Sequence, residues 1–323
     1  MWLKVSESEK KNFSLLSFAN RKGTTEGNFP DFLILGPQRT GTTWLADNIR
    51  FHPEIFMSNP KELYFFSRLG KNRKYSVELN HLVRTLRGKA RFTHRSTFRE
   101  ILKVTYYDLL LTGRYKAYEL EWYLRHFNLH NLLSRVHARK IKVLYGETYR
   151  PIRFGEATAS YAAMDPEQIQ EVVKLNPDVK ALLIVRNPID RAWSHATKDL
   201  IRDSPNSPQK VSDDQFIDFF REEYIMRCGQ YSTQIANWKK YLHAENLLVI
   251  NYNDLEHDPR KLLKRVFEFI GVSTEEKYIS DKLDEVVNPS SNNKAIPAKA
   301  KEFLTSAYSD EIKWIKDNLG ITV

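Results

Sequence analysis

Cysteine is almost absent, because Cys228 is the only one among 323 residues. A single cysteine excludes an intramolecular disulfide and a cysteine-based zinc site, and it fits a reducing compartment. Long hydrophobic runs are also lacking: stretches such as 181–185 have the length of a strand, not of a membrane span. No apolar signal-peptide core follows Met1. We therefore expect a soluble, cytoplasmic protein.

Glycine and proline are scarce, at 12 and 13 residues, which excludes a collagen-like or low-complexity chain. Acidic residues are too few to balance the basic ones: 50 Lys and Arg against 40 Asp and Glu leave a net charge of +10. The excess is concentrated in 68–103, which holds eleven Lys and Arg but only Glu78 and Glu100. Such a segment suits phosphate, sulfate, nucleic acid or an anionic membrane surface, and equally a solvated helical face.

Alternating strands and helices predict the fold class. Three short apolar runs have the pattern of buried parallel strands: 31–36, 179–185 and 246–251. With helices between them, they predict a three-layer α/β fold whose central parallel sheet is flanked by helices. Residues 1–30 are expected to form an irregular lead-in to a single domain over 31–323, and the basic, aromatic stretch at about 70–150 a helical insertion.

The predicted helices have recognisable starts. Asp165-Pro-Glu-Gln168 and Ser212-Asp-Asp-Gln215 have the form of capping boxes, and Asp258-Pro259 begins a further helix. In the helix after Ser212 we expect one buried face, made of Phe216, Phe219, Phe220 and Tyr224.

The segment after the first strand has the features of an anion-binding loop. It leads into a helix that opens at Gly41, and the N–H groups at a helix start carry a partial positive charge. Gly36 and Gly41 have the spacing of a Walker A loop, but Thr42 stands in place of its lysine and the cation is Arg39. No predicted strand ends in an aspartate that could hold Mg²⁺. The sequence therefore predicts a phosphate site without a metal.

A second anion site is predicted after the strand 179–185. Arg186 lies at its carboxyl end, where open α/β sheets bind ligands. The helix begun by Pro188 brings Ser194, two turns along, to the side of Arg186. An arginine and a serine together can clamp a phosphate, whereas Arg186 alone would equally suit a structural ion pair.

These two segments resemble the PAPS-dependent sulfotransferases, where PAPS is 3′-phosphoadenosine 5′-phosphosulfate. The resemblance covers about 31–67 and 116–272. It implies a P-loop-like fold and a 5′-phosphosulfate site made of Pro37, Gln38, Arg39, Thr40, Gly41, Thr42, Thr43 and Trp44. In that family the residue matching Trp44 packs on adenine, and Arg186 and Ser194 match the 3′-phosphate ligands. Lys294 is a substitute candidate for a third contact, because the C-terminal Lys-Gly motif of the cytosolic enzymes is not evident.

The resemblance also implies a general base. The segment Lys61-Glu-Leu-Tyr-Phe-Phe66 is similar to one in heparan-sulfate-type sulfotransferases, where a glutamate beside aromatic residues is the base. The matching residue here is Glu62, and a positioned carboxylate can take the proton of an acceptor hydroxyl. Lys61 would supply charge to the leaving group together with Arg39. We expect the rival bases His52 and His195 to be structural.

The sequence thus predicts an enzyme that transfers the sulfuryl group of PAPS to a hydroxyl of a small-molecule, lipid or carbohydrate acceptor. Two alternatives stay open: a P-loop kinase that uses ATP and Mg²⁺, and a non-enzymatic protein that binds an anionic polymer or membrane. The segment 68–103 is then interpreted as an acceptor-side or assembly surface, with membrane contact and a homo-oligomer left open and no nucleic-acid partner expected.

Overall fold

The computed structural model describes residues 29–59, 61–69, 120–129, 132–202, 211–280, 283 and 295–323. The chain divides into two compact units. The first, which we call the sheet unit, comprises Phe29–Ser67 and Leu129–Val323. Of the second unit, the described residues are Arg68, Leu69 and 120–128. Most of the basic segment 68–103, and Lys294, lie outside the described residues.

A five-stranded parallel sheet forms the centre of the sheet unit, in the order β2-β3-β1-β4-β5. Its strands are β1 (Phe32–Gly36), β2 (Ile55–Met57), β3 (Arg153–Ala157), β4 (Lys180–Val185) and β5 (Leu247–Asn251). The three predicted strands are confirmed as β1, β4 and β5. The sequence pattern misses β2 because it is three residues long, and β3 because Gly155 and Glu156 interrupt its apolar run.

Gly155 in β3 is required by packing. It pairs with Phe32 of β1, and a Cβ at position 155 would lie 2.1 Å from the Phe32 ring. A larger residue would therefore push β3 away from β1, and the two strands carry the site described below.

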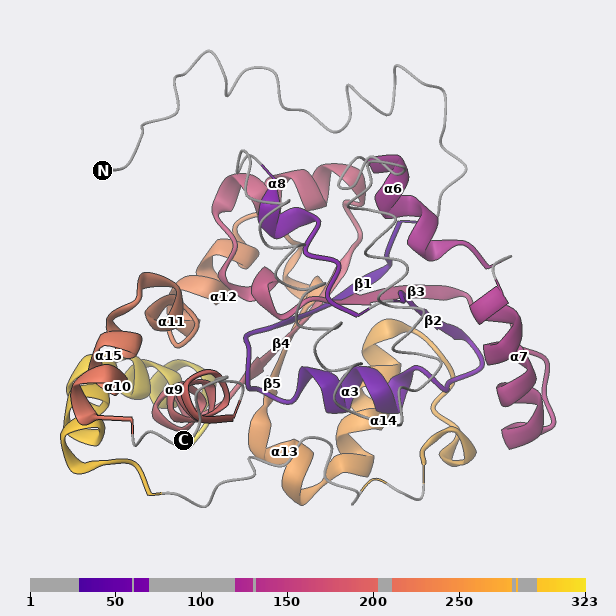
Figure 1. Ribbon diagram of the computed structural model, residues 1–323. Helices are drawn as coiled ribbons and strands as arrows, with labels where there is room; N and C mark the ends of the chain where they lie inside the picture. Colours follow the sequence, from indigo (N-terminus) through magenta and orange to yellow (C-terminus); the bar gives the residue numbers. More distant parts are fainter. Residues whose placement is uncertain are drawn as a thin grey trace, which may run out of the picture. The chain divides into compact units, whose positions relative to one another are not determined.

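The helices cover both faces of this sheet. In chain order, those of the sheet unit are α3 (Thr42–Ile49), α7 (Leu132–Tyr145), α8 (Pro166–Leu175), α9 (Pro188–Ala196), α10 (Asp213–Arg221), α11 (Glu223–Arg227), α12 (Tyr231–Lys239), α13 (Tyr252–His257), α14 (Pro259–Ile270) and α15 (Ala298–Leu319). Figure 1 shows α3 and α14 on one side of the sheet, and α8 and α12 on the other. The predicted three-layer, P-loop-like α/β fold is thereby confirmed.

Shorter turns join these elements. They are the 3₁₀ helices η1 (Phe66–Arg68), η3 (Ala159–Ala163), η5 (Ala244–Asn246) and η6 (Glu276–Tyr278), and the π-helix η4 (Thr197–Arg202), which continues α9. In the second unit, α6 (Leu120–Leu124) and η2 (Arg125–Phe127) follow one another. Within the predicted insertion, the described residues 120–127 and 132–145 are helical, whereas its boundaries stay a prediction.

Among the residues that the structure describes, two hydrophobic cores follow from these layers. The main one joins the sheet to α3 and α14, through residues such as Ile34, Leu182 and Phe267 that are fully buried. The other joins α9, α10 and α15 beside the sheet, with Phe220 and Tyr308 at its centre. Alternate residues of the central strands β1 and β4 face opposite layers, so these two strands are buried on both sides.

The predicted helix starts are confirmed. Asp165 and Ser212 each form a capping box, at α8 and α10, and Asp258 accepts a hydrogen bond from the N–H of Lys261 at the start of α14. The face predicted for α10 is wrong at Tyr224. The helix ends at Arg221, because Glu222 adopts an extended conformation with φ −58° and ψ 127°, so Tyr224 belongs to α11 and is 40% exposed.

Candidate active site

The predicted phosphate loop lies between the carboxyl end of β1 and the start of α3. Gly41 is the N-cap of α3, with φ 86°, and no side chain caps this helix end. The first N–H groups of a helix have no partner within the helix, so this end offers donors to an anion. Arg39 also has a positive φ, 72°, which is uncommon for a residue with a side chain and is often found at functional sites.

Gly36 lets a second segment approach this loop closely. Its φ is 104°, and a Cβ there would lie 2.3 Å from the carbonyl oxygen of Ala159. The N–H of Ala159 donates to Oε2 of Glu62 at 2.9 Å, and the N–H of Glu62 donates to the carbonyl of Ala157 at 3.0 Å. The close approach at Gly36 thus brings the candidate base beside the loop.

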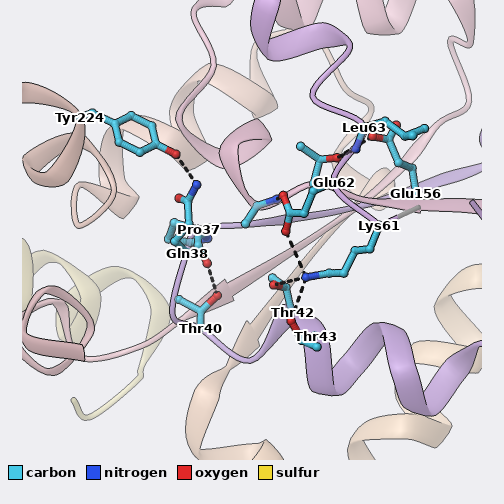
Figure 2. A network of polar contacts seen from close by, with 12 residues as sticks. Pro37, Gln38, Thr40, Thr42, Thr43, Lys61, Glu62, Leu63, Glu156 and Tyr224 are labelled. Atoms are coloured by element: carbon cyan, nitrogen blue, oxygen red, sulfur yellow. Dashed lines mark hydrogen bonds and ion pairs between the residues drawn. The ribbon is translucent and has the colours of Figure 1, made fainter. Parts of the chain in front are cut away.

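Lys61 connects Glu62 to the start of α3. Its Nζ lies 3.1 Å from Oε1 of Glu62, and it donates to Oγ1 of Thr43 at 2.9 Å and to Oγ1 of Thr42 at 3.3 Å. Figure 2 shows the Lys61 side chain between Glu62 and the first turn of α3. A Walker A loop has a lysine at the position of Thr42. Here a lysine nineteen residues along the chain brings its ammonium to the same helix start.

A second cationic group lies on the other side of the loop. Arg39 donates from Nε to Oγ of Ser194 at 2.9 Å, and Arg186 donates from Nη1 to the carbonyl of Arg39 at 2.8 Å. The structure therefore brings together Arg39 from the loop after β1, Arg186 from the carboxyl end of β4, and Ser194 from α9. The Arg186 guanidinium also lies 4.4 Å from the centre of the Tyr252 ring, and the backbone N–H of Arg186 donates to the hydroxyl of Tyr231 at 3.2 Å.

Several predicted ligand side chains turn away from the helix start. The Gln38 amide donates to the Tyr224 hydroxyl and accepts from the Cys228 thiol at 3.4 Å, which ties the loop to α11 (Figure 2). Thr40 is fully buried, and its hydroxyl donates to the carbonyl of Pro37 at 2.7 Å. These side chains shape the loop, so the predicted binding through Pro37, Gln38 and Thr40 would use the backbone.

Trp44 is buried in the main hydrophobic core. Its exposed fraction is 8%, and its indole N–H donates to the carbonyl of Leu283 at 3.5 Å. The adenine contact that the family resemblance implies for Trp44 stays a prediction.

A buried carboxylate supports the Glu62 segment from below. Glu156 on β3 is fully buried and accepts from the Thr158 hydroxyl at 2.6 Å. Thr158 in turn accepts from the N–H of Leu63 at 3.0 Å. Burial, followed by the charge of Glu156, raises the pKa of the neighbouring Tyr161, so that phenol stays neutral. These polar groups therefore hold the Glu62 segment in place.

The rival bases His52 and His195 are both buried and make contacts within the fold, which fits the structural role predicted for them. The His52 Nε2 lies 2.9 Å from the carbonyl of Ser273, and its Nδ1 accepts from the N–H of Glu54 at 3.1 Å. Burial lowers the pKa of His52. His195 is buried against Phe219, and burial lowers its pKa as well, despite an Asp199 oxygen 3.4 Å away.

No group of three or more His, Cys, Asp or Glu side chains in the described part of the chain could hold a metal ion. The residues that follow the carboxyl ends of β4 and β5 are Arg186 and Tyr252, and neither can bind Mg²⁺ as a Walker-type aspartate does. Among the described helices, none is both long and apolar enough to cross a membrane.

Comparison with known proteins decides between the interpretations. The family model described as "Sulfotransferase domain" matches residues 29–317. This chain belongs to the sulfotransferase family. The family assignment agrees with the fold, and it favours the sulfotransferase interpretation over the kinase and the non-enzymatic protein.

Relatives of this sulfotransferase include heparan sulfate enzymes. The bifunctional heparan sulfate N-deacetylase/N-sulfotransferase 1 of Xenopus laevis is 24% identical over 276 residues, which are 80% of this chain and 24% of the relative. The Homo sapiens protein of the same name is 23% identical over 78% of this chain and 23% of its own length. The chain thus spans about a quarter of the length of these relatives.

Two further comparisons agree with the family. Sulfotransferase 6B1 of Mus musculus is 31% identical over 125 residues, 38% of each chain. A sulfotransferase structure from Alicyclobacillus acidocaldarius matches with a TM-score of 0.54 and 21% identity, covering 92% of this chain and 98% of its own. This structure supports the fold of the sulfotransferase.

Sequence reasoning missed several residues of the site. Ala159 and Tyr224 act through a backbone N–H and a phenol whose positions no motif reveals. Tyr231 was part of the resemblance but was not assigned to the site. Tyr252 has a recognisable signal, because it directly follows the carboxyl end of β5, at the edge of the sheet where ligands bind.

Proposed function

We propose that this sulfotransferase transfers the sulfuryl group of PAPS to a hydroxyl of a small-molecule, lipid or carbohydrate acceptor, with Glu62 as the general base. The observation that carries the proposal is the bridge made by Lys61. One ammonium lies within hydrogen-bond distance of Glu62 and of the hydroxyls at the start of α3. The Lys61 side chain therefore connects the proposed base to the proposed anion site.

The side chains around the loop fit a nucleotide that carries several negative charges. Arg39, Arg186, Lys61 and Ser194 converge there with the uncapped start of α3. These groups are cations, a hydroxyl and backbone N–H groups, all of which can donate hydrogen bonds to phosphate and sulfate oxygens. In this proposal Arg186 and Ser194 hold the 3′-phosphate, and the loop holds the 5′-phosphosulfate.

The chemistry follows from which groups hold and move protons. Glu62 takes the proton of the acceptor hydroxyl, whose oxygen forms a bond to sulfur while the bond from sulfur to the phosphate oxygen breaks. The released phosphate gains negative charge, which Arg39, Lys61 and the N–H groups of the loop stabilise because they are already oriented. Ala159 keeps one carboxylate oxygen of Glu62 in place during this step.

The test is the substitution Glu62→Gln, which keeps the hydrogen bond with the Ala159 N–H but removes the base. We expect kcat to fall by about 10²- to 10⁴-fold. Binding of 3′,5′-ADP, measured as a thermal shift without added metal, should stay at the wild-type level. Glu223→Gln, on the exposed part of α11, is the matched control and should keep full activity.

Two results would overturn parts of this proposal. Wild-type turnover of Glu62→Gln would exclude Glu62 as the base. Stabilisation by ATP with Mg²⁺ but not by 3′,5′-ADP would exclude PAPS as the donor.

An amine is the second candidate acceptor. The relatives that align with 80% and 78% of this chain are named N-sulfotransferases, and a carboxylate can also accept the proton released by an attacking amine. Offering PAPS with matched alcohol and amine acceptors, and weighing the products by mass spectrometry, distinguishes O-sulfation from N-sulfation.

A further inference from the structure

Helix α7 (Leu132–Tyr145) packs on the sheet unit with one face. Its Ile141 is fully buried, and its His137 ring lies 5.6 Å from the Phe51 ring and 4.9 Å from the Tyr149 ring. Tyr149 donates a hydrogen bond to the carbonyl of Ile55 on β2 at 3.0 Å, so this face is anchored beside the edge strand. Figure 1 shows α7 at the edge of the sheet unit, past β2.

The opposite face of α7 combines exposed apolar and basic side chains. Val136, Val143 and Leu144 are 59%, 78% and 51% exposed. The other members of this face, all exposed, are Arg135, Arg139, Lys140 and Lys142. At about 100° per residue, the side of α7 opposite the buried Ile141 holds Arg135, Val136, Arg139, Lys142 and Val143, and Lys140 and Leu144 lie at its border. We call this surface the outer face of α7.

The positive charge of the outer face is not neutralised by nearby acids. Helix α7 contains no Asp or Glu, and within the described part of the chain no carboxylate forms an ion pair with any of its four cations. Lys142 donates to the carbonyl of Gly146 at 2.7 Å, and Lys140 lies 4.1 Å from the centre of the Phe51 ring. Both contacts leave the full positive charge in place.

We propose that the outer face of α7 docks on the surface of a bilayer that contains anionic lipids. A lipid surface offers anionic headgroups to Arg135 and Arg139, and beside them an acyl boundary into which Val143 and Leu144 can insert. Helices that lie in the membrane interface have this combination of basic and apolar side chains.

Two other occupants fit this face less well. An anionic polymer such as a sulfated polysaccharide pairs with the cations but leaves Val136, Val143 and Leu144 in water. A second copy of the chain that presents its own α7 would bring four cations against four, which repel each other. The exposed apolar residues therefore favour a lipid surface over a polymer as the occupant of this face. The positive charge favours a lipid surface over a second copy of the chain.

The test uses the full chain and co-sedimentation with vesicles of phosphatidylcholine containing roughly one quarter phosphatidylglycerol. We expect binding that weakens with salt and is absent on pure phosphatidylcholine. The double variant Arg135→Ser/Arg139→Ser should lower the partition coefficient about tenfold or more. The triple variant Val136→Ser/Val143→Ser/Leu144→Ser should also lower it about tenfold, at unchanged charge.

A matched control removes two exposed cations elsewhere. Lys313→Ser/Lys316→Ser on α15 changes the net charge equally and should keep vesicle binding. Unchanged thermal unfolding of every variant shows that each one is folded. Vesicle binding by the triple variant at the wild-type level would overturn the proposal, because it would show that the apolar side chains do not insert into the bilayer. If the Arg135/Arg139 variant binds vesicles as well as the wild type does, the outer face of α7 is not the docking surface. If the wild type does not bind vesicles at all, the proposal is also wrong.

Discussion

The two ends of the parallel sheet both carry cations, but their partners differ. At the amino end, Arg153 donates to the carbonyl of Ile270 at 2.9 Å, and Lys180 donates to the carbonyl of Phe269. Both carbonyls belong to the last turn of α14, whose partial negative charge these cations complement. At the carboxyl end, Arg39 and Lys61 donate to side-chain hydroxyls.

The difference shows why a cation alone does not identify a site. A backbone carbonyl at a helix end needs a donor, so the cations at the amino end are part of the fold. A hydroxyl can exchange its partner for a phosphate or sulfate oxygen, so the cations at the carboxyl end can turn to a ligand. Parallel strands followed by helices place the helix starts at one edge of the sheet and the helix ends at the other, and this separates the two roles.

The largest effect is expected at the carboxyl end. Arg39→Met should lower kcat/KM by about 10²- to 10³-fold, because it removes an oriented charge at the leaving group. Lys180→Met at the amino end is the matched control, with activity per folded molecule retained. Equal losses of activity in the two variants would contradict the comparison.

A smaller effect is expected at the amino end, on stability. Arg153→Met should lower the free energy of unfolding by about 1–2 kcal/mol, because the last turn of α14 loses a charge-assisted hydrogen bond. Urea unfolding measures the loss, and kcat should stay at the wild-type value. A drop in kcat without a drop in stability would show that this end also serves catalysis.

The smallest effect is a pH dependence of stability through His52, which packs against the ring of Phe267 in α14. Burial lowers the pKa of His52 in the folded chain, so the unfolded chain binds a proton that the folded chain does not. The contribution of neutral His52 to the free energy of unfolding is therefore complete above the pKa of the unfolded chain, about 6.5. As the pH falls below that value, the free energy of unfolding decreases by at most about 1.4 kcal/mol per pH unit.

The variant His52→Gln tests this dependence. Its free energy of unfolding should fall less steeply than that of the wild type between neutral pH and mildly acid pH, measured by urea unfolding at each pH. Parallel curves for the two proteins would show that His52 does not carry the effect.

Local signals in the sequence were sufficient for the strand, loop and helix that form the phosphate loop. Gly36 and Gly41 mark the ends of this loop, and both have the positive φ that favours glycine. The capping residues Asp165 and Ser212 also act within four residues of themselves, which is why the sequence revealed them. Tyr224 was misplaced because the break at Glu222 has no Gly or Pro to mark it.

Long-range contacts were not visible in the sequence. The family resemblance pointed to Glu62, but its hydrogen bond with the Ala159 N–H depends on how the strand β3 lies beside β1. The same is true of Gln38 with Tyr224, which are 186 residues apart. Such pairings depend on strand order and register, which no local pattern encodes.

The sequence by itself determined the candidate anion-binding loop, the strand that precedes Arg186 and the family to which the chain belongs, because these depend on the spacing of neighbouring residues. Only the tertiary structure decided which cations lie at the candidate site. It brought Lys61 to the start of α3 and joined Arg39 to Ser194, while it used Arg153 to cap α14. The physical reason is that the role of a charge depends on its hydrogen-bond partner, and packing chooses that partner.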